Sequence, residues 1–340
     1  NRVLAVLVIA TPCPLILATP IALIGGINSA AKYQIIIKNG AALEVLSRIN
    51  TLIFDKTGTI TIGKPELVNL EIANKHYAEN EVLGIAASME RNSLHPFAKA
   101  IVKKAKDMSL PNYLVQDINE ILGTGIEAVL NDKKYSLIKS ITQGDIQMMA
   151  DDNLIATFHF KDMPKQGSEK VFEKLLKMKV RMIMFTGDKL DKAQEVLKDL
   201  NLDIQVKAEC KPEDKKTGIE ELKKNGATIA MVGDGVNDAP ALAMADVGMV
   251  FSNEEHTASS EAADIVFLNG DIEAVTKSIL ISKRTIDIAM QSIYFGIGLS
   301  VIGMIFASFG FIVPVVGAFI QEAIDFSVIM NALRSSRIKA

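Results

Sequence analysis

The stretch Thr51-Leu-Ile-Phe-Asp55-Lys-Thr-Gly-Thr59 decides the fold, because an apolar run ends abruptly in a carboxylate and a polar turn. Two later stretches repeat this plan. Val180-Arg-Met-Ile-Met-Phe185 runs into Thr186-Gly-Asp188, and Ile229-Ala-Met-Val232 runs into Gly233-Asp-Gly-Val-Asn-Asp238. Each is the pattern of a buried strand followed by a turn that contains glycine.

Helical stretches, such as residues 168–178 and 189–200, alternate with these strands. Strands that alternate with helices predict a parallel, doubly wound α/β sheet. Ligands of such sheets bind at the carboxyl ends of the strands. We therefore expect the three turns that carry aspartates to converge on one site.

A carboxylate at a strand end, Asp55, can act as a nucleophile toward phosphorus. Asp234 can help Asp55 to hold Mg²⁺, which prefers oxygen ligands. Thr186 and the amide of Gly187 can donate hydrogen bonds to phosphate oxygens, and Lys215 can add a positive charge. The sequence therefore predicts phosphoryl transfer.

Position 57, two residues after the predicted nucleophile, is a threonine. Simple phosphatases that use an aspartate place a second acid there as general acid and base. Without that acid, an aspartyl phosphate at Asp55 should persist. A persistent intermediate suits an enzyme that couples phosphoryl transfer to another process better than it suits a hydrolase.

The apolar residues of the chain are concentrated at its two ends. No charged residue occurs from Val3 to Ala31 or from Ile288 to Gln321, and about 20 apolar residues are enough for a membrane-spanning helix. We expect one span at residues 1–31 and a helical hairpin at 285–333, with its turn at Gly310 and Pro314. Basic residues flank both regions, which places the middle of the chain in the cytoplasm.

The middle of the chain is predicted to be one domain inserted into another. The strand and helix pattern covers residues 32–64 and 162–284, whereas residues 65–161 resemble a small α+β insert. Residues 334–340 would form a cytoplasmic tail. The chain begins with Asn1, and we expect it to be a fragment that starts inside a membrane helix.

Composition excludes several classes of protein. A net charge of −3 argues against a nucleic-acid binder, and 49% apolar residues argue against a disordered chain. Two cysteines cannot form a disulfide framework, so the part outside the membrane is predicted to be intracellular.

Several motifs in a fixed order resemble the P-type ATPases. They are Asp55-Lys-Thr-Gly-Thr59, Thr186-Gly-Asp188, Pro212-Glu-Asp-Lys215 and Gly233-Asp-Gly-Val-Asn-Asp-Ala-Pro-Ala-Leu242. Further motifs resemble the heavy-metal-transporting subfamily: Thr11-Pro-Cys-Pro14, Ser93-Leu-His-Pro96 and Asn331-Ala-Leu333. The resemblance covers essentially the whole chain but only part of a complete pump, since the actuator domain and the early membrane helices are missing.

The resemblance implies a haloacid-dehalogenase-like phosphorylation domain with an inserted nucleotide-binding domain, flanked by transmembrane helices. ATP would phosphorylate Asp55, and Mg²⁺ would be held by Asp55, the Thr57 carbonyl and Asp234. The remaining residues of the phosphorylation site would be Lys56, Thr186, Gly187, Asp188, Lys215, Asn237 and Asp238. The residues around the nucleotide would be Glu90, His95, Pro96, Gly123 and Gly125.

The transported cation would be a metal of the Zn, Cd, Co and Cu class. Cys13, in a helix that its neighbouring prolines break, is the candidate thiol ligand, and Glu322 and Asp325 are candidate carboxylates, with Gln321 as a weaker one. Thr11 stands where heavy-metal pumps often carry a second cysteine. A mixed set of thiol and carboxylate ligands favours a borderline divalent ion over Cu⁺.

Two other functions stay open from the sequence. One is a membrane-anchored phosphohydrolase of the haloacid-dehalogenase type that does not transport; the other is a remnant that only binds nucleotide. For the leading hypothesis, the location would be the bacterial plasma membrane, with several spans and a cytoplasmic catalytic body.

Overall fold

The computed structural model describes residues 2–11, 13–121, 124–140, 145–233, 238–252 and 261–339. It contains two compact units, one formed by residues 1–60 and 165–340 and the other by residues 61–164. The sequence placed the two crossings at 64/65 and 161/162. The structure places them at 60/61 and 164/165, so the second unit is four residues longer at one end and three at the other, because strands β3 (Thr61–Ile72) and β8 (Asn153–Pro164) already pair at Thr61 and Pro164.

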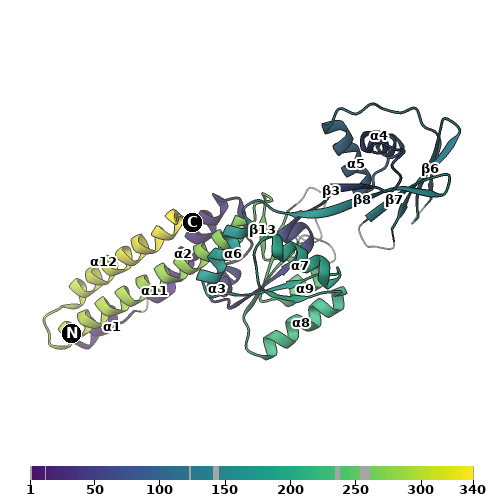
Figure 1. Ribbon diagram of the computed structural model, residues 1–340. Helices are drawn as coiled ribbons and strands as arrows, with labels where there is room; N and C mark the ends of the chain where they lie inside the picture. Colours follow the sequence, from purple (N-terminus) through teal and green to yellow (C-terminus); the bar gives the residue numbers. More distant parts are fainter. Residues whose placement is uncertain are drawn as a thin grey trace. The chain divides into compact units, whose positions relative to one another are not determined.

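The first unit is built on a seven-stranded sheet, in which β1 is antiparallel to β13 and all other neighbours are parallel (Figure 1). In order across the sheet, the strands are β1 (Ile35–Ile37), β13 (Ile265–Phe267), β12 (Val247–Phe251), β11 (Ile229–Gly233), β2 (Thr51–Asp55), β9 (Arg181–Phe185) and β10 (Gln205–Lys207). The parallel, doubly wound prediction is confirmed.

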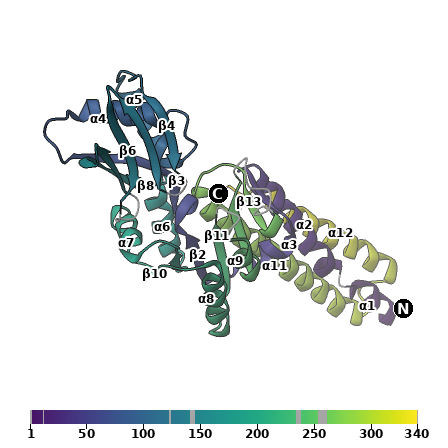
Figure 2. The same cartoon turned by 90° about the vertical axis from the view of Figure 1, so that its right-hand side faces the viewer.

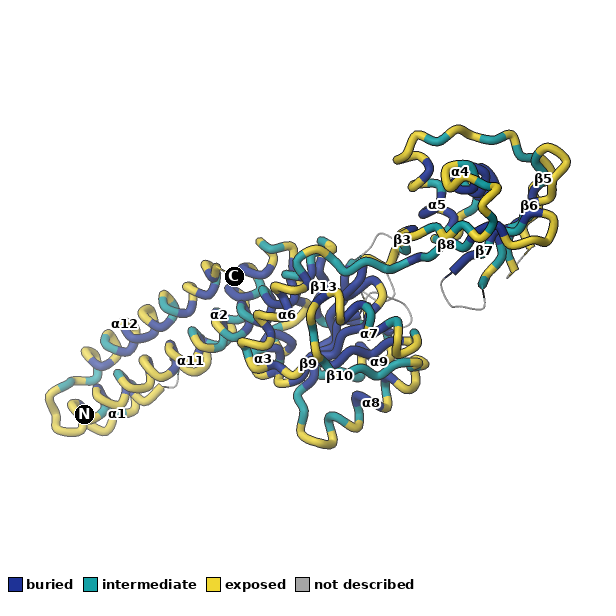
Figure 3. The backbone as a smooth tube through the Cα atoms, viewed as in Figure 1, coloured by how far each residue is buried: buried dark blue, intermediate teal, exposed yellow. Residues whose placement is uncertain are grey.

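Helices cover both faces of this sheet because successive side chains of a strand point to opposite faces. On one face, Phe54 packs in a core with α3 (Gly40–Ser47), α6 (Ser168–Lys177) and α7 (Leu190–Asp199). On the other face, Ile53 packs in a core with α8 (Pro212–Lys224) and α9 (Ala239–Met244). Every residue of the central strands β2, β11, β12 and β13 is accordingly buried, whereas the edge strands β1 and β10 are partly exposed (Figure 3).

The register brings the three predicted turns together. Asp55 of β2 lies opposite Phe185 of β9, and Phe54 lies opposite Val232 of β11. Because these strands are parallel, their carboxyl ends meet at one edge of the sheet. Thr186 and Gly233 therefore flank Asp55.

Four helices continue from this unit: α1 (Arg2–Ile9), α2 (Cys13–Ala31), α11 (Glu273–Ser308) and α12 (Pro314–Ala332), with η3 (Leu333–Arg337) after the last. Figure 2 shows α2, α11 and α12 running side by side. Within the described residues, three helical stretches are long and apolar enough to cross a membrane, namely Arg2–Ala31, Glu273–Ser308 and Pro314–Arg337.

The hairpin turns where the sequence predicted. Gly310 adopts a φ of 91°, a conformation that favours glycine, and Pro314 opens α12. One boundary differs, since α11 starts at Glu273 and continues without interruption through the predicted domain boundary at residue 284.

The second unit is an α+β fold, as predicted. Its antiparallel sheet has the order β3, β8, β7 (Asp145–Ala150), β6 (Lys133–Lys139), β5 (Gly125–Leu130) and β4 (Gln116–Ile121). Helices α4 (Glu79–Met89) and α5 (Pro96–Asp107) form its core with this sheet. His95 caps α5, and Pro96 occupies the first helical turn, where a missing N–H costs little.

Candidate active site

A buried cluster of three charged side chains lies at the end of β2. Lys215, from α8, donates hydrogen bonds to Asp55 Oδ1 at 2.5 Å and to Asp238 Oδ1 at 2.7 Å. The exposed fractions are 7% for Asp55, 7% for Lys215 and 2% for Asp238. Three elements far apart in sequence therefore bring together three of the predicted residues.

The electrostatics of this cluster hold Lys215 in its charged form. Burial alone would lower the pKa of Lys215, but the carboxylates of Asp55 and Asp238 outweigh this effect and raise the pKa above its ordinary 10.5. One lysine faces two carboxylates, so the cluster keeps a net negative charge that a divalent cation would neutralise.

Asp238 is held in place by a glycine. A Cβ on Gly233 would lie 2.8 Å from Asp238 Oδ2, closer than any real Cβ contact. The glycine at the end of β11 therefore leaves the space in which the Asp238 carboxylate reaches Lys215.

The turn after β9 forms the second side of the site. Thr186 Oγ1 accepts a hydrogen bond from the Asp188 amide at 3.1 Å, so its own hydroxyl proton remains available to a ligand. Asp188 pairs with Lys56 at 2.8 Å, which links this turn to the residue after Asp55. Gly187 is exposed beside them.

The turn that follows Asp55 also requires a glycine. Gly58 has a φ of 70°, and Thr57 before it is extended, with φ −73° and ψ 131°. Thr57 is exposed while Lys56 and Thr59 are buried. Two predicted residues of this site, Asp234 and Asn237, lie outside the described residues.

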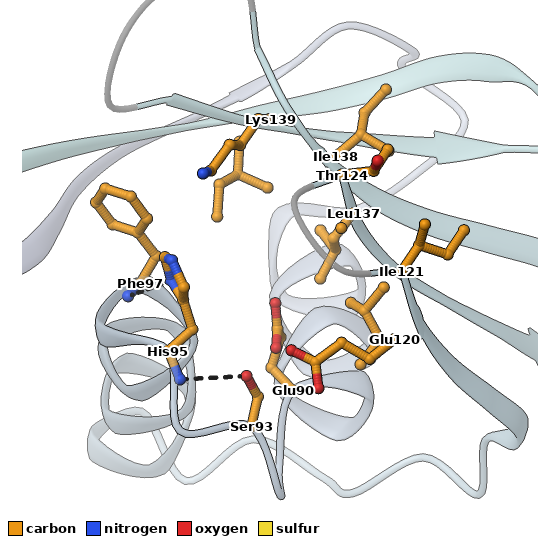
Figure 4. A pocket seen from close by; sticks show the side chains of 13 residues that line it. Glu90, Ser93, His95, Phe97, Glu120, Ile121, Thr124, Leu137, Ile138 and Lys139 are labelled. Carbon is orange, nitrogen blue, oxygen red and sulfur yellow. Dashed lines mark hydrogen bonds between the residues drawn. The ribbon is translucent and has the colours of Figure 1, made fainter.

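The second unit contains a pocket with the predicted nucleotide residues (Figure 4). Glu90, His95 and Gly125 line it, and Pro96 fixes the start of the helix behind His95. The predicted Gly123 lies outside the described residues. The sequence missed the other lining residues, which are Ser93, Phe97, Glu120, Ile121, Thr124, Ile126, Leu137, Ile138, Lys139 and Ile146.

One wall of the pocket is aromatic. His95 Nδ1 accepts the Phe97 amide at 3.3 Å, so the proton of a neutral ring sits on Nε2. The centroids of the His95 and Phe97 rings are 5.2 Å apart, and Phe97 in turn packs on Phe160 at 4.7 Å. Phe97 directly follows the predicted His95-Pro96 step, so its position in the sequence could have identified it as a residue of the same wall.

Two carboxylates, Glu90 and Glu120, lie side by side on the opposite wall (Figure 4). Burial raises the pKa of Glu90 above its ordinary 4.5; a hydrogen bond with Ser93 opposes this rise, and the charge of Glu120 adds to it. Gly125 is required by the sheet, because a Cβ there would lie 1.9 Å from the Leu137 carbonyl oxygen.

In the apolar helices, the break between α1 and α2 falls beside Cys13, a partly buried free thiol. Gln321 and Asp325 are buried in α12, and Gln321 Nε2 donates to Asp325 Oδ1 at 3.0 Å. Ser300 of α11 donates to Gln321 Oε1 at 3.3 Å. Glu322 is exposed on another face of α12, so it does not join this network.

Comparison with known proteins agrees with this geometry. The profile of the haloacid dehalogenase-like hydrolases matches residues 49–246. A copper-exporting P-type ATPase of Staphylococcus haemolyticus is 36% identical over 99% of this chain and 44% of its own length. A cadmium-transporting ATPase of Staphylococcus aureus is 31% identical over 99% of this chain and 50% of its own. The chain belongs to the heavy-metal P-type ATPases, a branch of the haloacid dehalogenase-like hydrolases.

Solved structures of P-type ATPases match as well. A zinc-transporting PIB-type ATPase in the E2.Pi state superimposes with a TM-score of 0.88 at 28% identity, over 97% of this chain and 57% of that one. The catalytic domain of the CPx-ATPase CopB-B gives 0.64 at 36% identity, over 73% of this chain and 96% of that one. This P-type ATPase chain spans about half the length of the curated relatives it matches.

Proposed function

We propose that this chain carries the catalytic part and several membrane helices of a pump that uses ATP to move a heavy-metal cation across a membrane. The observation that carries the proposal is that the Asp55–Lys215–Asp238 cluster and three helices able to span a membrane belong to one compact unit. A change at the phosphorylated residue can therefore act on the membrane helices through a continuous packed structure.

In the proposed reaction, an Asp55 carboxylate oxygen attacks the γ-phosphorus of ATP. A bond forms between that oxygen and phosphorus, and the bond from phosphorus to the bridging oxygen breaks, with its electron pair leaving on ADP. Lys215 has three N–H donors and uses two in the cluster described above, so it can turn toward the transferred phosphoryl group. The Thr186 hydroxyl and the Gly187 amide would donate to the other oxygens.

P-type ATPases use ATP and Mg²⁺, and the residues around Asp55 fit that ion. The described part of the site offers carboxylate and carbonyl oxygens, which are the ligands that Mg²⁺ prefers. Asp55, the Thr57 carbonyl and Asp234 would hold it. When bound, the ion would neutralise charge on the phosphate oxygens.

The pocket of the second unit would bind the nucleotide. His95 would present a ring face and an Nε2–H donor, and Phe97 behind it would keep the ring upright. Glu90 would accept from the base, and Gly125, together with Gly123, would let the backbone approach the nucleotide closely. This unit, residues 65–161 by sequence, would be the nucleotide-binding domain.

The cation site would lie where α2, α11 and α12 pack together. A Cβ on Gly296 would lie 2.5 Å from Pro14 and 2.7 Å from Val328, so these three helices meet closely beside Cys13 and one turn from Asp325. Cys13 and Asp325 would be ligands, with Gln321, which is hydrogen-bonded to Asp325, as a further candidate and Glu322 available to a helix outside this chain. A thiol with oxygen donors suits a borderline divalent ion such as Zn²⁺, Cd²⁺ or Co²⁺ better than Cu⁺.

The actuator domain and the remaining membrane helices would come from the part of the pump that this chain does not cover. The membrane would be the bacterial plasma membrane, with several spans and the catalytic units in the cytoplasm. The basic residues beside the spans support that orientation.

The test is formation of a phosphoenzyme. The full chain, purified in detergent, is incubated with ATP labelled at the γ-phosphate and Mg²⁺ and is then quenched in acid, with Asp55→Asn as the matched variant. We expect a label that survives acid, is released by hydroxylamine and is missing in Asp55→Asn. Steady release of phosphate with no trapped label would overturn the proposal in favour of a phosphohydrolase.

A further inference from the structure

The ends of the spans nearest the phosphorylation domain are tied together by the last residues of the chain. Ser29 of α2 donates to the Ile338 carbonyl at 2.9 Å, and Lys32 donates to the Ser336 carbonyl at 2.7 Å. Arg284 of α11 donates to the Lys339 carbonyl. The segment 333–339 is therefore held against two helices by hydrogen bonds from their side chains.

Six basic residues lie in the three stretches that meet at this junction and are here called the basic collar. They are Lys32, Lys283, Arg284, Arg334, Arg337 and Lys339. In the stretches that carry them, residues 29–33, 282–288 and 331–339, the one carboxylate is Asp287, so the local charge is six minus one, or +5.

No ion pair joins the collar to a carboxylate anywhere in the described ranges. Within the described residues its side-chain hydrogen bonds go to neutral oxygens instead: Lys32 and Arg284 donate to carbonyls, and Arg334 donates to Asn331 Oδ1 at 2.7 Å. Lys32 keeps two N–H donors, and Arg284 and Arg334 keep four each, while the other three collar side chains make no hydrogen bond to a described residue. The positive charge of the collar is thus uncompensated, although three of its six side chains are oriented by hydrogen bonds.

Exposed apolar side chains lie next to the collar on the same helices. Met290 of α11 is 40% exposed, Met330 of α12 is 52% exposed and Leu333 is 45% exposed, each within about two turns of a collar residue. A ligand that fits both surfaces carries an anionic group next to hydrocarbon. This combination favours a lipid over a nucleic acid or an acidic protein.

We propose that the basic collar binds the phosphate headgroup of an anionic phospholipid and that the bound headgroup fixes the segment 333–339 against α2 and α11. Guanidinium groups match phosphate oxygens with two parallel hydrogen bonds. A zwitterionic lipid neutralises its own phosphate, so the collar should discriminate against it.

The experiment measures lipid binding to the full chain in detergent by native mass spectrometry, with phosphatidylglycerol and phosphatidylcholine of identical acyl chains. We expect phosphatidylglycerol to bind at least about tenfold more tightly, since each Lys or Arg near an anionic surface contributes roughly a fivefold gain. Equal affinities for the two lipids would overturn the proposal.

The collar variant is Arg337→Gln with Lys339→Gln, whose side chains make no hydrogen bond to another described residue, so the fold should survive the change. It should weaken phosphatidylglycerol binding about 25-fold, at roughly fivefold per charge. The control Lys104→Gln with Lys106→Gln removes two exposed lysines of α5 and should leave binding unchanged. Loss of affinity in both variants alike would show a general charge effect and refute a specific collar.

Hydrogen exchange of residues 333–339 separates a lipid from a free anion. Phosphatidylglycerol should slow exchange there in the wild type and not in the collar variant. If inorganic phosphate alone slows exchange to the same extent, the ligand is a free phosphate and the lipid proposal is wrong. These readouts require no ATP, so they are independent of the pump function.

Discussion

Replacing Lys215 by methionine, a side chain of similar length without the charge, should destabilise the first unit. In the wild type, one lysine offsets two carboxylates that are almost fully buried. In Lys215→Met, both carboxylates lose their cation. They still lie close enough to each other that one ammonium group contacts both in the wild type. Removing one partner of a buried ion pair costs about 3–5 kcal/mol of unfolding free energy.

The matched variant is Asp55→Asn, which leaves Lys215 paired with one carboxylate and makes the cluster neutral. Asp55→Asn should lower the free energy of unfolding by less than about 2 kcal/mol, which is the range of one charged hydrogen bond. The charge arithmetic therefore predicts that the lysine variant is by far the less stable of the two, because it removes both hydrogen bonds of Lys215, whereas Asp55→Asn changes only one partner of the cluster.

The effect of Lys215→Met should also depend on pH. Without the cation, the two buried carboxylates repel each other while both are ionised, and binding of a proton at low pH relieves this repulsion. The difference from wild type should therefore shrink from pH 7 toward pH 5.

The assay is pulse proteolysis in urea, since the chain has no tryptophan to report unfolding. Fragments are assigned to each unit by mass spectrometry, because two units need not unfold together. Equal destabilisation by Lys215→Met and Asp55→Asn, or a difference that does not change with pH, would refute the reasoning.

Three further predictions concern the second unit. Gly125→Ala should weaken ATP binding at least about tenfold, measured with a fluorescent ATP analogue, because its Cβ would strike the Leu137 carbonyl; Gly270→Ala, with nothing within 4 Å, is the control. Asp162→Ala removes the hydrogen bonds that Asp162 accepts from Thr61 Oγ1 at 2.5 Å and from the Gly63 amide at 2.9 Å. It should lower the unfolding free energy of this unit by about 2–4 kcal/mol, measured by the same proteolysis, and a loss under about 1 kcal/mol would contradict the prediction. The raised pKa of Glu90 contributes stability below pH 4.5 that is lost as pH rises through the folded value, so Glu90→Gln should be more stable than wild type at pH 7 and lose this advantage near pH 4; a constant difference would count against it.

The grouping of residues around Asp55 was predictable because its sequence signal is local. An apolar run that ends in Asp55, and two further runs of the same kind, are visible in the sequence without tertiary knowledge. The motif that contains Lys215 and the charge of its side chain predicted that this residue belongs to the site. Its two hydrogen bonds, to Asp55 and to Asp238, depend on how α8 packs on the sheet. Sequence reasoning names such a residue but does not give its partners.

Other features were missed for physical reasons. Strands β1 and β13 are three residues long, too short for a periodic pattern. Glu120 lines the pocket of the second unit because β4 pairs with β5, a long-range contact that local sequence does not reveal. Lys283 and Arg284 were taken as the end of the soluble domain, but a helix tolerates them because Arg284 is exposed and Lys283 is partly exposed.

The exposed position of Glu322 could have been anticipated. Gln321, Asp325, Val328 and Ala332 follow one another at three or four residues, which is the spacing of one helix face, and all are buried. Glu322 lies about 100° away from that face. Helical spacing separates the two candidate carboxylates, whereas hydropathy alone does not.

The uninterrupted course of α11 has a mechanical consequence. Its 36 residues form a rod about 54 Å long, rooted in the core of the sheet at one end and reaching the hairpin at the other. A tilt of about 10° at the root would move the far end by about 9 Å, because an α-helix without proline bends little. Gly296 and Gly303 of this rod contact Pro14 and Ile9, on either side of the break between α1 and α2. A movement of α11 would therefore displace the residues on both sides of the break between α1 and α2.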